Sequence, residues 1–404
     1  MDTNEARRGA RRLPTRDSGR EDLLYGLERR WQTIGAPASQ DELLGGRARA
    51  RVADYANNIE NYIGTVALPV GMAGPLKVHG VAGTQSYCVP LATTEAALVA
   101  SYNRGARLLS EAGGCTARVV KKAVSRTPVF IFRRLVDAES FADFVCGAID
   151  RWCGLVNSVT RHGRLLDVEP CIEGNHVYLD LSYATGDASG QNMVTFASEA
   201  VCRAMADESP VKPERWFLEA NLSGDKKASA RALGGVRGRR TVAEVRLPAR
   251  LVGERLHTTP AAMVNYWYAG AIGGVMSGTT GIHGHFANGI AALYLACGQD
   301  VACVAESATG ITRLEMDEAG DLYAAVTLPN LMLGTVGGGT GLPSARACLD
   351  LLGLAGAGQA DALAEVCAAL VLGGELSIIA AFCSGDFANA HRCLSRGEPM
   401  QRRS

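Results

Sequence analysis

The 404-residue chain lacks an excess of charge of either sign, because 41 lysine and arginine residues balance 41 aspartate and glutamate residues. Proteins that bind nucleic acid or anionic membranes through their overall electrostatic field carry a marked positive excess. The composition therefore argues against both nucleic acid and a membrane surface as partners.

The 12 cysteines include no C-x-x-C pair. This scattered distribution is poor for a zinc cluster or a disulfide framework, and it is typical of reduced thiols in the cytoplasm. We expect most of these cysteines to be small core residues. The sequence predicts a cytoplasmic protein without a bound metal.

Long hydrophobic runs are also missing, since no segment reaches about 18 uninterrupted apolar residues, the length that a membrane span needs. The first 22 residues are rich in arginine and also acidic, without the apolar core of a secretory signal. We therefore expect residues 1–20 to be a mobile leader.

The chain is nevertheless 47% hydrophobic, enough to bury a large core in two or three domains of an α+β protein. Helical apolar spacing predicts a short N-terminal helical region over residues 21–58. Residues 59–105 and 230–404 are expected to form a large, mostly helical substrate domain, with strand candidates at 241–248 and 321–329. Between them, residues 106–218 contain strand-like and helix-like runs in the order β-α-β-β-α-β, which predicts an inserted ferredoxin-like domain. Residues 219–229 connect the two.

The stretch "ATGDASGQNMVTFASEA" (184–200) follows a strand-like run and contains Gly186 and Asp187. The small and polar residues after them are typical of a helix start, where backbone N–H groups can face a phosphate. We expect an anion to bind at this turn.

Four further segments contain chemically useful residues. Glu95 stands at an expected helix start, and the glycines of "LGTVGGGTGLP" allow a backbone to approach a ligand closely. Asp300 lies in a nearly uncharged run and needs a partner if it is buried. Lys226, in the loop "NLSGDKKASA", is the candidate partner, and no lysine follows Lys227 in the chain.

Several motifs occur together and in order: "ENYIG", "PVGMAGPL", "LATTEAALVAS", "GDASGQNM", "DKK", "ACGQD", "GTVGGGT" and "GELS". In these motifs the chain resembles the 3-hydroxy-3-methylglutaryl-CoA (HMG-CoA) reductases over roughly residues 55–392, and in particular the class I form without its membrane anchor. The resemblance implies NADPH-dependent reduction of HMG-CoA to mevalonate in two hydride transfers, a large CoA-binding domain and a small NADP-binding domain. It also implies a homodimer or higher homo-oligomer with active sites between subunits.

The resemblance assigns four catalytic residues. Lys226 would stabilise the oxyanion and Asp300 would hold Lys226, while Glu95 would donate a proton to the carbonyl oxygen. His391 matches a mobile histidine that protonates the departing CoA thiolate. The family uses no metal, and the pair His283 and His285 lacks an acidic third ligand nearby.

For the cofactor, the resemblance points to the turn after residue 186, the glycine loop, and a hydroxyl–arginine pair that faces the 2′-phosphate of NADPH. The corresponding residues here are Asp187, Ser189, Gly190, Gln191, Asn192, Thr160, Arg161, Gly337, Gly338, Gly339 and Thr340. Ser189 and Gln191 replace two methionines of the family turn. The guanidinium of Arg161 suits a phosphate, so NADPH is favoured over NADH.

The substrate pocket departs from the family pattern. A lysine that binds the substrate carboxylate is missing from "NYWYAGAIGG" (265–274), and Glu219 stands where the family has a serine. A carboxylate there would repel a substrate carboxylate unless it is protonated or paired. The expected substrate contacts are Arg104, Glu219, Asn221, Asp225, Lys227, His285 and Asn288.

Three functions follow in order of preference. The first is an HMG-CoA reductase, and the second is a family member that reduces a different acyl thioester in a specialised pathway. The third is a non-catalytic protein that binds CoA or a nucleotide, which the retention of all four catalytic residue types disfavours.

Overall fold

The computed structural model describes residues 20–388 and residue 392. Within them the chain divides between Leu68 and Pro69 into two compact units. The expected leader, apart from residue 20, and His391 both fall outside the described residues.

The N-terminal unit consists of four helices, which are α1 (Arg20–Ile34), α2 (Pro37–Leu44), α3 (Gly46–Ala50) and α4 (Val52–Tyr55). They lie where the apolar spacing predicted helices. A small core of their own includes the buried side chains of Leu27 and Trp31. The Trp31 indole donates a 2.8 Å hydrogen bond to the carbonyl of Ile63, which ties the segment after the helices to α1.

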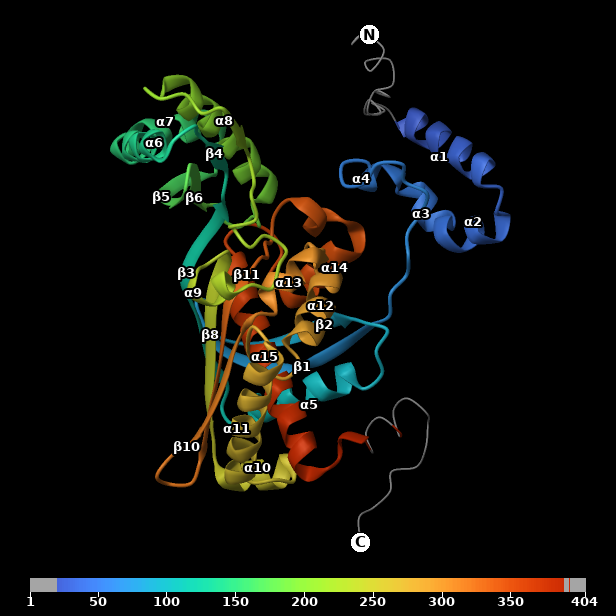
Figure 1. Ribbon diagram of the computed structural model, residues 1–404. Helices are drawn as coiled ribbons and strands as arrows, with labels where there is room; N and C mark the ends of the chain where they lie inside the picture. Colours follow the sequence, from blue (N-terminus) through green and yellow to red (C-terminus); the bar gives the residue numbers. More distant parts are fainter. Residues whose placement is uncertain (1–19, 389–391, 393–404) are drawn as a thin grey trace. The chain divides into compact units, whose positions relative to one another are not determined.

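The second unit contains a long mixed sheet in the order β2, β1, β3, β8, β11, β10, β9 (Figure 1). Its strands are β1 (Val70–Gly80), β2 (Gly83–Ala92), β3 (Cys115–Arg126), β8 (Gly238–Leu247), β9 (Gly281–Ile282), β10 (Gly310–Met316) and β11 (Leu322–Leu331). Neighbouring strands are antiparallel except for β1 with β3 and β9 with β10. Strands β8 and β11 confirm the two strand candidates in this part of the sequence.

The large sheet also contains strands that the sequence did not predict, namely β1, β2 and β3. Glycine and proline disfavour strand assignments, and β1 contains Gly71, Gly74 and Pro75. Pairing with β2 and β3 overrides this low propensity, since it buries the middle of β1.

Helices pack on this sheet around α15 (Ala360–Ser384), which contacts β1, β3, β8 and β11. The others are α5 (Leu98–Glu111), α9 (Ala230–Gly234), α10 (Ala249–Leu256), α11 (Pro260–Ser277), α12 (Phe286–Ala296), α13 (Val304–Ser307) and α14 (Pro343–Leu352), with short 3-10 turns at Val301–Cys303 and Gly338–Gly341. Gly105 of α5 touches the backbone of α15, where an added Cβ would lie 2.0 Å from the carbonyl oxygen of Gly373. The domain boundary expected after residue 105 therefore falls inside an unbroken packed helix.

By length and composition, α15 is the one helix in the described chain apolar enough to cross a membrane, yet 83% of its most apolar 18-residue window is buried. This burial is what a core helix of a folded domain shows.

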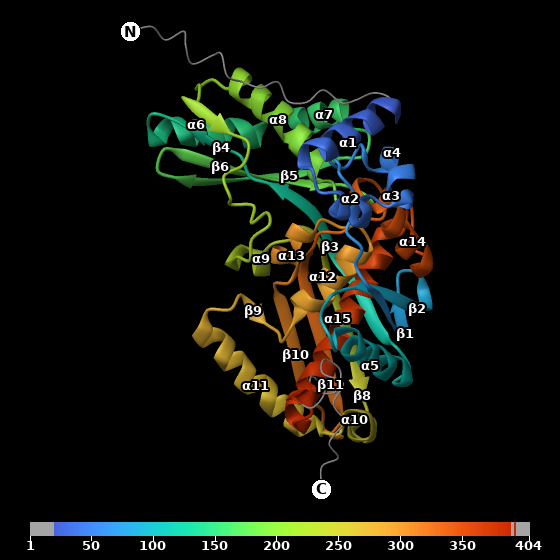
Figure 2. The same ribbon diagram turned by 90° about the vertical axis from the view of Figure 1, so that its right-hand side faces the viewer.

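A second layer continues from the end of β3 (Figure 2). Its strands lie in the order β7 (Arg215–Phe217), β4 (Val129–Ile131) with the end of β3, β6 (His176–Ala184) and β5 (Arg164–Glu173). Helices α6 (Leu135–Gly147), α7 (Ile149–Val159) and α8 (Gln191–Glu208) pack against it. Along the chain these elements follow the predicted β-α-β-β-α-β order, and β3 is shared by both layers.

Candidate active site

Lys226 and Asp300 form an ion pair, with 2.8 Å between Nζ and Oδ2. The hydrogen bond that the Lys226 ammonium donates to Asp300 raises the pKa of Lys226. Partial burial opposes ionisation of Asp300, but the hydrogen bond and charge of Lys226 outweigh it, and the pKa of Asp300 is lowered. The lysine therefore carries a firmly held positive charge, and the pairing expected from the sequence is confirmed.

Buried charges hold the loop that carries Lys226. The carboxylate of Asp225 lies 3.1 Å from Arg126 Nη1 and 2.8 Å from Arg237 Nη2. Arg237 is 2% exposed and also pairs with Glu306, at 2.6 Å. Burial raises the pKa of Glu306 even though Arg237 lies beside it. The residue next to the lysine is thus fixed to the fold by two arginines.

Glu219 does not stand free beside the lysine loop. Its carboxylate accepts hydrogen bonds from Arg126 Nη1 at 3.2 Å, Asn221 N at 2.8 Å, Ala220 N at 3.1 Å and the Ser223 hydroxyl at 3.1 Å. Repulsion of a substrate carboxylate was expected only for an unpaired Glu219. Because the side chain is paired, its role here is to fold the loop.

The expected phosphate-binding turn lies between β6 and α8. Gly190 precedes α8 with a φ of 76°, and an added Cβ would lie 2.3 Å from the Thr185 side chain, so glycine is required. Gly190 offers no capping side chain, and the N–H groups of the first turn of α8, including that of Asn192, remain suited to an anion.

Asp187 anchors this turn to the rest of the unit. Its carboxylate accepts hydrogen bonds from Gly358 N at 2.7 Å and Ala360 N at 3.2 Å, at the start of α15. Its carbonyl accepts one from Thr335 N at 2.9 Å. The turn therefore lies against the segment that leads into Gly337–Thr340. The Asp187 carboxylate therefore shapes the turn through these backbone hydrogen bonds, and its negative charge does not suit it to bind a phosphate directly.

The glycine loop also meets the segment that carries Asp300. Gln299 exchanges two hydrogen bonds with Gly334, at 2.8 and 3.0 Å. Gly298 lies so close to Gly339 that an added Cβ would be 2.4 Å from its carbonyl oxygen. The sequence motifs "GDASGQNM", "ACGQD" and "GTVGGGT" thus come together in one place.

Thr160 and Arg161 follow α7, close to the same turn. The Thr160 hydroxyl accepts a 3.1 Å hydrogen bond from Gly163 N, and Gly163 packs against Met193 of α8. Arg161 is exposed. Its guanidinium is therefore accessible on the side of the small layer where α8 begins.

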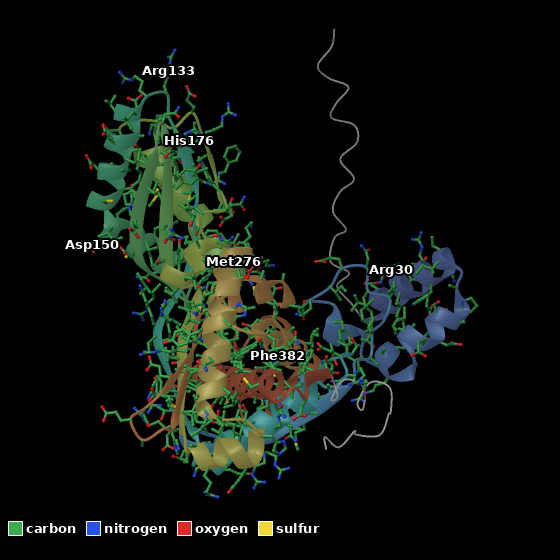
Figure 3. All side chains as sticks on the ribbon, turned by 60° about the horizontal axis from the view of Figure 1, so that its bottom comes forward. Arg30, Arg133, Asp150, His176, Met276 and Phe382 are labelled. Atoms are coloured by element: carbon green, nitrogen blue, oxygen red, sulfur yellow. The ribbon has the colours of Figure 1, made fainter. Side chains whose placement is uncertain are left out.

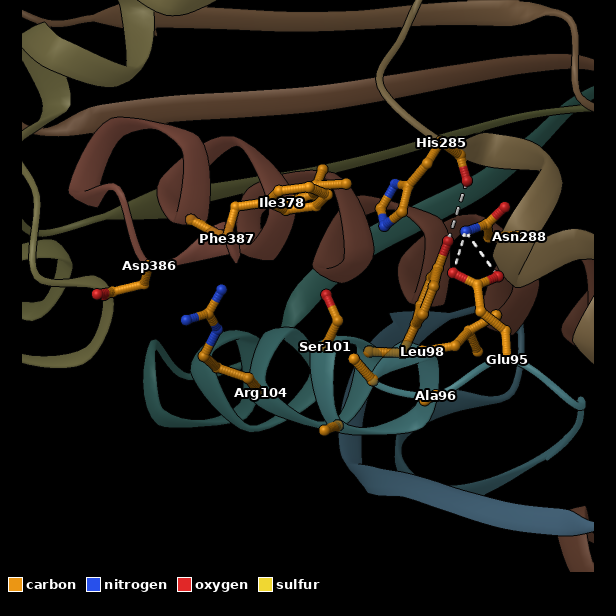
Figure 4. Close-up of a pocket in the computed structure, with 14 residues that line it drawn as sticks. Glu95, Ala96, Leu98, Ser101, Arg104, His285, Asn288, Ile378, Asp386 and Phe387 are labelled. Carbon is orange, nitrogen blue, oxygen red and sulfur yellow. Dashed lines mark hydrogen bonds between the residues drawn. The ribbon is translucent and has the colours of Figure 1, made fainter. Parts of the chain in front are cut away.

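A separate cavity of about 310 Å³ contains Glu95 (Figure 4). The amide of Asn288 donates to both carboxylate oxygens of Glu95, at 3.2 and 3.3 Å. Arg104 lies toward the other end of the cavity and donates to the hydroxyl and carbonyl of Ser377. Burial lowers the pKa of Arg104, against the opposing charge of Asp386.

His285 lines the same cavity and is held from behind by Glu375. One carboxylate oxygen of Glu375, which is 1% exposed, lies 3.1 Å from His285 Nδ1 and accepts from His285 N at 2.8 Å. The other accepts from Gly284 N and from Thr312 Oγ1, at 2.8 and 2.7 Å. The ring of Tyr102 stacks on that of His285 at 5.3 Å. The histidine ring is therefore fixed in orientation.

The candidate catalytic residues lie in two separate groups within one chain. Among the described residues that line the Glu95 cavity, neither Lys226 nor Asp300 is present. Asn288, beside Glu95, lies in the first turn of α12, while Asp300 follows its last turn. At a rise of about 1.5 Å per residue, the part of α12 from Asn288 to Ala296 alone separates them by roughly 12 Å. Asn221 and Lys227 belong to the lysine group.

No group of three or more His, Cys, Asp or Glu side chains is placed to hold a metal ion in residues 20–388.

Comparison with known proteins points to one family. A family model described as hydroxymethylglutaryl-coenzyme A reductase matches residues 27–396. The chain is 43% identical over 348 residues to the 3-hydroxy-3-methylglutaryl-coenzyme A reductase of Pyrococcus horikoshii, covering 84% of each chain. It is 44% identical over 352 residues to that of Aeropyrum pernix, covering 85% of this chain and 83% of the relative.

A solved structure of similar fold is the class II reductase of Streptococcus pneumoniae bound to NADPH. The TM-score is 0.68 at 20% identity, covering 88% of this chain and 86% of that one. At this identity the likeness concerns the fold.

Proposed function

Because the chain belongs to the hydroxymethylglutaryl-coenzyme A reductase family, we propose that it reduces HMG-CoA to mevalonate with two molecules of NADPH. The observation that carries the proposal is the 2.8 Å pair of Lys226 and Asp300 beside the turn at residues 186–192. A cation at that point suits a reaction in which negative charge develops on a carbonyl oxygen.

Different residues of the chain carry out different steps of the proposed reaction. NADPH, when bound, supplies the hydride for each of the two reductions. Lys226 stabilises the oxyanion, an effect typically worth about 3 kcal/mol, and Glu95 donates the proton to that oxygen. The first reduction gives a hemithioacetal. Its hydroxyl returns the proton to Glu95 as the C–S bond breaks, which yields an aldehyde and CoA thiolate. His391 protonates the thiolate, so that it does not recapture the aldehyde before the second reduction.

The turn and its neighbours fit a dinucleotide phosphate. The uncapped start of α8 presents N–H groups, and Gly337–Thr340 brings a second flexible backbone close to the turn. Ser189, Gly190, Gln191 and Asn192 would lie along the pyrophosphate. The exposed guanidinium of Arg161, next to Thr160, would bind the 2′-phosphate, which favours NADPH over NADH.

Arg161→Ala tests the cofactor assignment. Loss of a charge-assisted contact of about 1.5–3 kcal/mol should raise the KM for NADPH by roughly 10-fold or more. The KM for NADH should change little, because NADH carries no 2′-phosphate. Steady-state kinetics with both cofactors measures the difference, and an equal rise in the two KM values would remove the basis for the NADPH preference.

We further propose that the active site is assembled from two copies of the chain. Glu95 and Lys226 have to act on one carbonyl oxygen, yet they belong to the two separate groups within a single chain. A homodimer or larger homo-oligomer brings the Glu95 cavity of one copy to the Lys226 loop of another. His285, Asn288 and Arg104 then contact the substrate from one side, and Asn221 and Lys227 from the other.

The proposal extends to the fold of the small domain, the class of the enzyme and its location in the cell. The strand order β7, β3/β4, β6, β5 with helices on one face supports a ferredoxin-like cofactor domain. The placement as a class I-like enzyme rests on the sequence motifs alone. The proposed cytoplasmic location rests on the scattered cysteines of the sequence.

A second candidate, reduction of an acyl thioester without a terminal carboxylate, is favoured by the missing lysine in residues 265–274. NADPH oxidation with HMG-CoA, compared with neutral acyl-CoA thioesters of similar size, separates the two. We expect HMG-CoA to give the highest kcat/KM, and two NADPH consumed per CoA released. A higher kcat/KM for a neutral thioester would establish the second candidate.

A further inference from the structure

Gln191 occupies a position where the resembled family turn has a methionine. In the structure its amide Nε2 donates to Asp300 Oδ2 at 3.1 Å and lies 3.0 Å from Cys303 Sγ. We propose that Gln191 is a positioning residue that couples the cofactor turn to the Lys226–Asp300 pair. The inference rests on the proposed function and adds a residue that the family pattern does not contain.

The carboxylate of Asp300 has three donors. Lys226 Nζ and Gln191 Nε2 both reach Oδ2, at 2.8 and 3.1 Å, while Ala302 N reaches Oδ1 at 3.1 Å. Because the Lys226 and Asp300 side chains are 42% and 38% exposed, packing alone does not fix them. The amide of Gln191 therefore helps to set where Oδ2 lies, and with it the position of the lysine Nζ.

Gln191 is also part of the cofactor turn, since it is the first residue of α8 and follows Gly190 directly. If the backbone moves at this turn, the Gln191 side chain moves with it and shifts the Asp300 carboxylate to which it is hydrogen-bonded.

A second connection runs from the same helical turn to the lysine loop. The Thr195 hydroxyl donates to the Gln191 carbonyl at 2.8 Å and accepts from Arg126 Nη2 at 3.1 Å. Arg126 in turn binds Asp225, the residue before Lys226. The first turn of α8 thus supports the catalytic pair from two directions.

A methionine at this position has no N–H to donate. The hydrogen bond from Gln191 is one of the interactions that lower the pKa of Asp300, after the hydrogen bond and charge of Lys226 and the N–H of Ala302. Its removal should therefore raise the pKa of Asp300. The charged and titratable groups around Asp300 are Lys226 and Cys303, with Asp225, Arg237 and Glu306 behind the loop.

The test compares the unmodified protein with Gln191→Met and with the control Gln85→Met, an exposed glutamine whose amide only donates to Ala82 O. Carboxyl ¹³C NMR follows the titration of Asp300, with Asp300→Asn used to assign its signal. We expect the apparent pKa of Asp300 to rise by roughly half a pH unit in Gln191→Met and to stay unchanged in Gln85→Met.

Coupling is tested by adding NADPH to the same samples. The cofactor should shift the Asp300 titration in the unmodified protein and shift it less in Gln191→Met. The acid limb of the kcat profile should move to higher pH in Gln191→Met, with a several-fold lower kcat at the acid end and a KM for HMG-CoA within about twofold.

The proposal is overturned if Asp300 titrates identically with and without the Gln191 amide, or if NADPH shifts both proteins equally. The NMR titration needs no turnover, so a protein inactive toward HMG-CoA would contradict the proposed function while leaving this test intact.

Discussion

Lys226 carries its positive charge because Asp300 stabilises the protonated form, and its backbone is held by the arginines that bind Asp225. The pKa of Asp300 is lowered and that of Lys226 is raised, so the pair is fully ionised around neutral pH. In the proposed reaction, an oxyanion formed beside Lys226 would meet a preorganised cation, and little reorganisation would be needed.

Glu219 supplies a prediction at the same scale. The sequence pattern alone suggests that Glu219→Ser improves the use of HMG-CoA, whereas the structure has this carboxylate folding the lysine loop and pairing with Arg126. We therefore expect Glu219→Ser to lower kcat/KM roughly 10-fold for HMG-CoA and for a neutral thioester alike, because taking a partner from the buried Arg126 costs about 1–3 kcal/mol. Kinetics with both substrates and thermal denaturation measure this, with the exposed Glu139→Ser as control.

An increase of kcat/KM confined to HMG-CoA would instead restore the view that Glu219 repels the substrate carboxylate.

The sequence predicted the Lys226–Asp300 pair and the turn before α8. A single charge in an apolar run and a glycine at the end of a strand can both be recognised from neighbouring residues alone. It did not predict Arg126, Arg237 or Glu306, which lie in β3, directly before β8 and in α13. Nothing in the neighbouring sequence distinguishes one arginine from the others. Arg126, Arg237 and Glu306 reach the lysine loop only because the folded sheet brings their segments together.

At the scale of elements, α15 contains two buried glutamates in opposite electrostatic situations. Burial raises the pKa of Glu365, which the N–H groups of Val81 and Val119 only partly offset. Burial also opposes ionisation of Glu375, but the hydrogen bond and charge of His285, with further donors, lower its pKa overall.

The opposite pKa shifts of Glu375 and Glu365 predict opposite effects of two matched variants on the free energy of unfolding. The contribution of Glu375 is present above its unfolded pKa and is lost as the pH falls through the lower folded value. Glu365, with its folded pKa raised, favours folding at low pH and disfavours it as the pH rises through that value. At pH 7, Glu375→Gln should destabilise by about 1–3 kcal/mol, whereas Glu365→Gln should be neutral or stabilising.

Chemical denaturation at pH 7 and at pH 4 measures both variants. The deficit of Glu375→Gln should shrink at pH 4, and any gain of Glu365→Gln should shrink as well. Equal destabilisation by both variants at pH 7 would contradict the assignment of His285 as the partner that stabilises the Glu375 charge.

Elements were predicted unevenly for physical reasons. Strands β6, β8 and β11 have alternating or β-branched sequences and were expected, while β1 and β2 are held by pairing in spite of glycine and proline. The large sheet was missed because its formation depends on contacts between segments more than 100 residues apart, such as β3 with β8.

At the scale of the whole molecule, the surface of α11 supports assembly. Tyr268, Ile272, Val275 and Met276 recur at helical spacing and are 58%, 63%, 76% and 83% exposed, and Figure 3 labels Met276. A contiguous exposed apolar face of this kind marks an interaction site in soluble proteins. A second copy of the chain as its partner agrees with a reaction that needs both the Glu95 cavity and the Lys226 loop.

The central claim is that one active site takes Glu95 from one copy and Lys226 from another, and mixing two inactive variants tests it most directly. Glu95→Gln and Lys226→Ala are co-expressed with different affinity tags, and NADPH oxidation with HMG-CoA is measured on the doubly purified mixed oligomer. A mixed dimer contains one intact pair of Glu95 and Lys226, so we predict about half of the unmodified activity per dimer. A mixed oligomer as inactive as either variant alone would show that both residues act within one chain and would contradict the account.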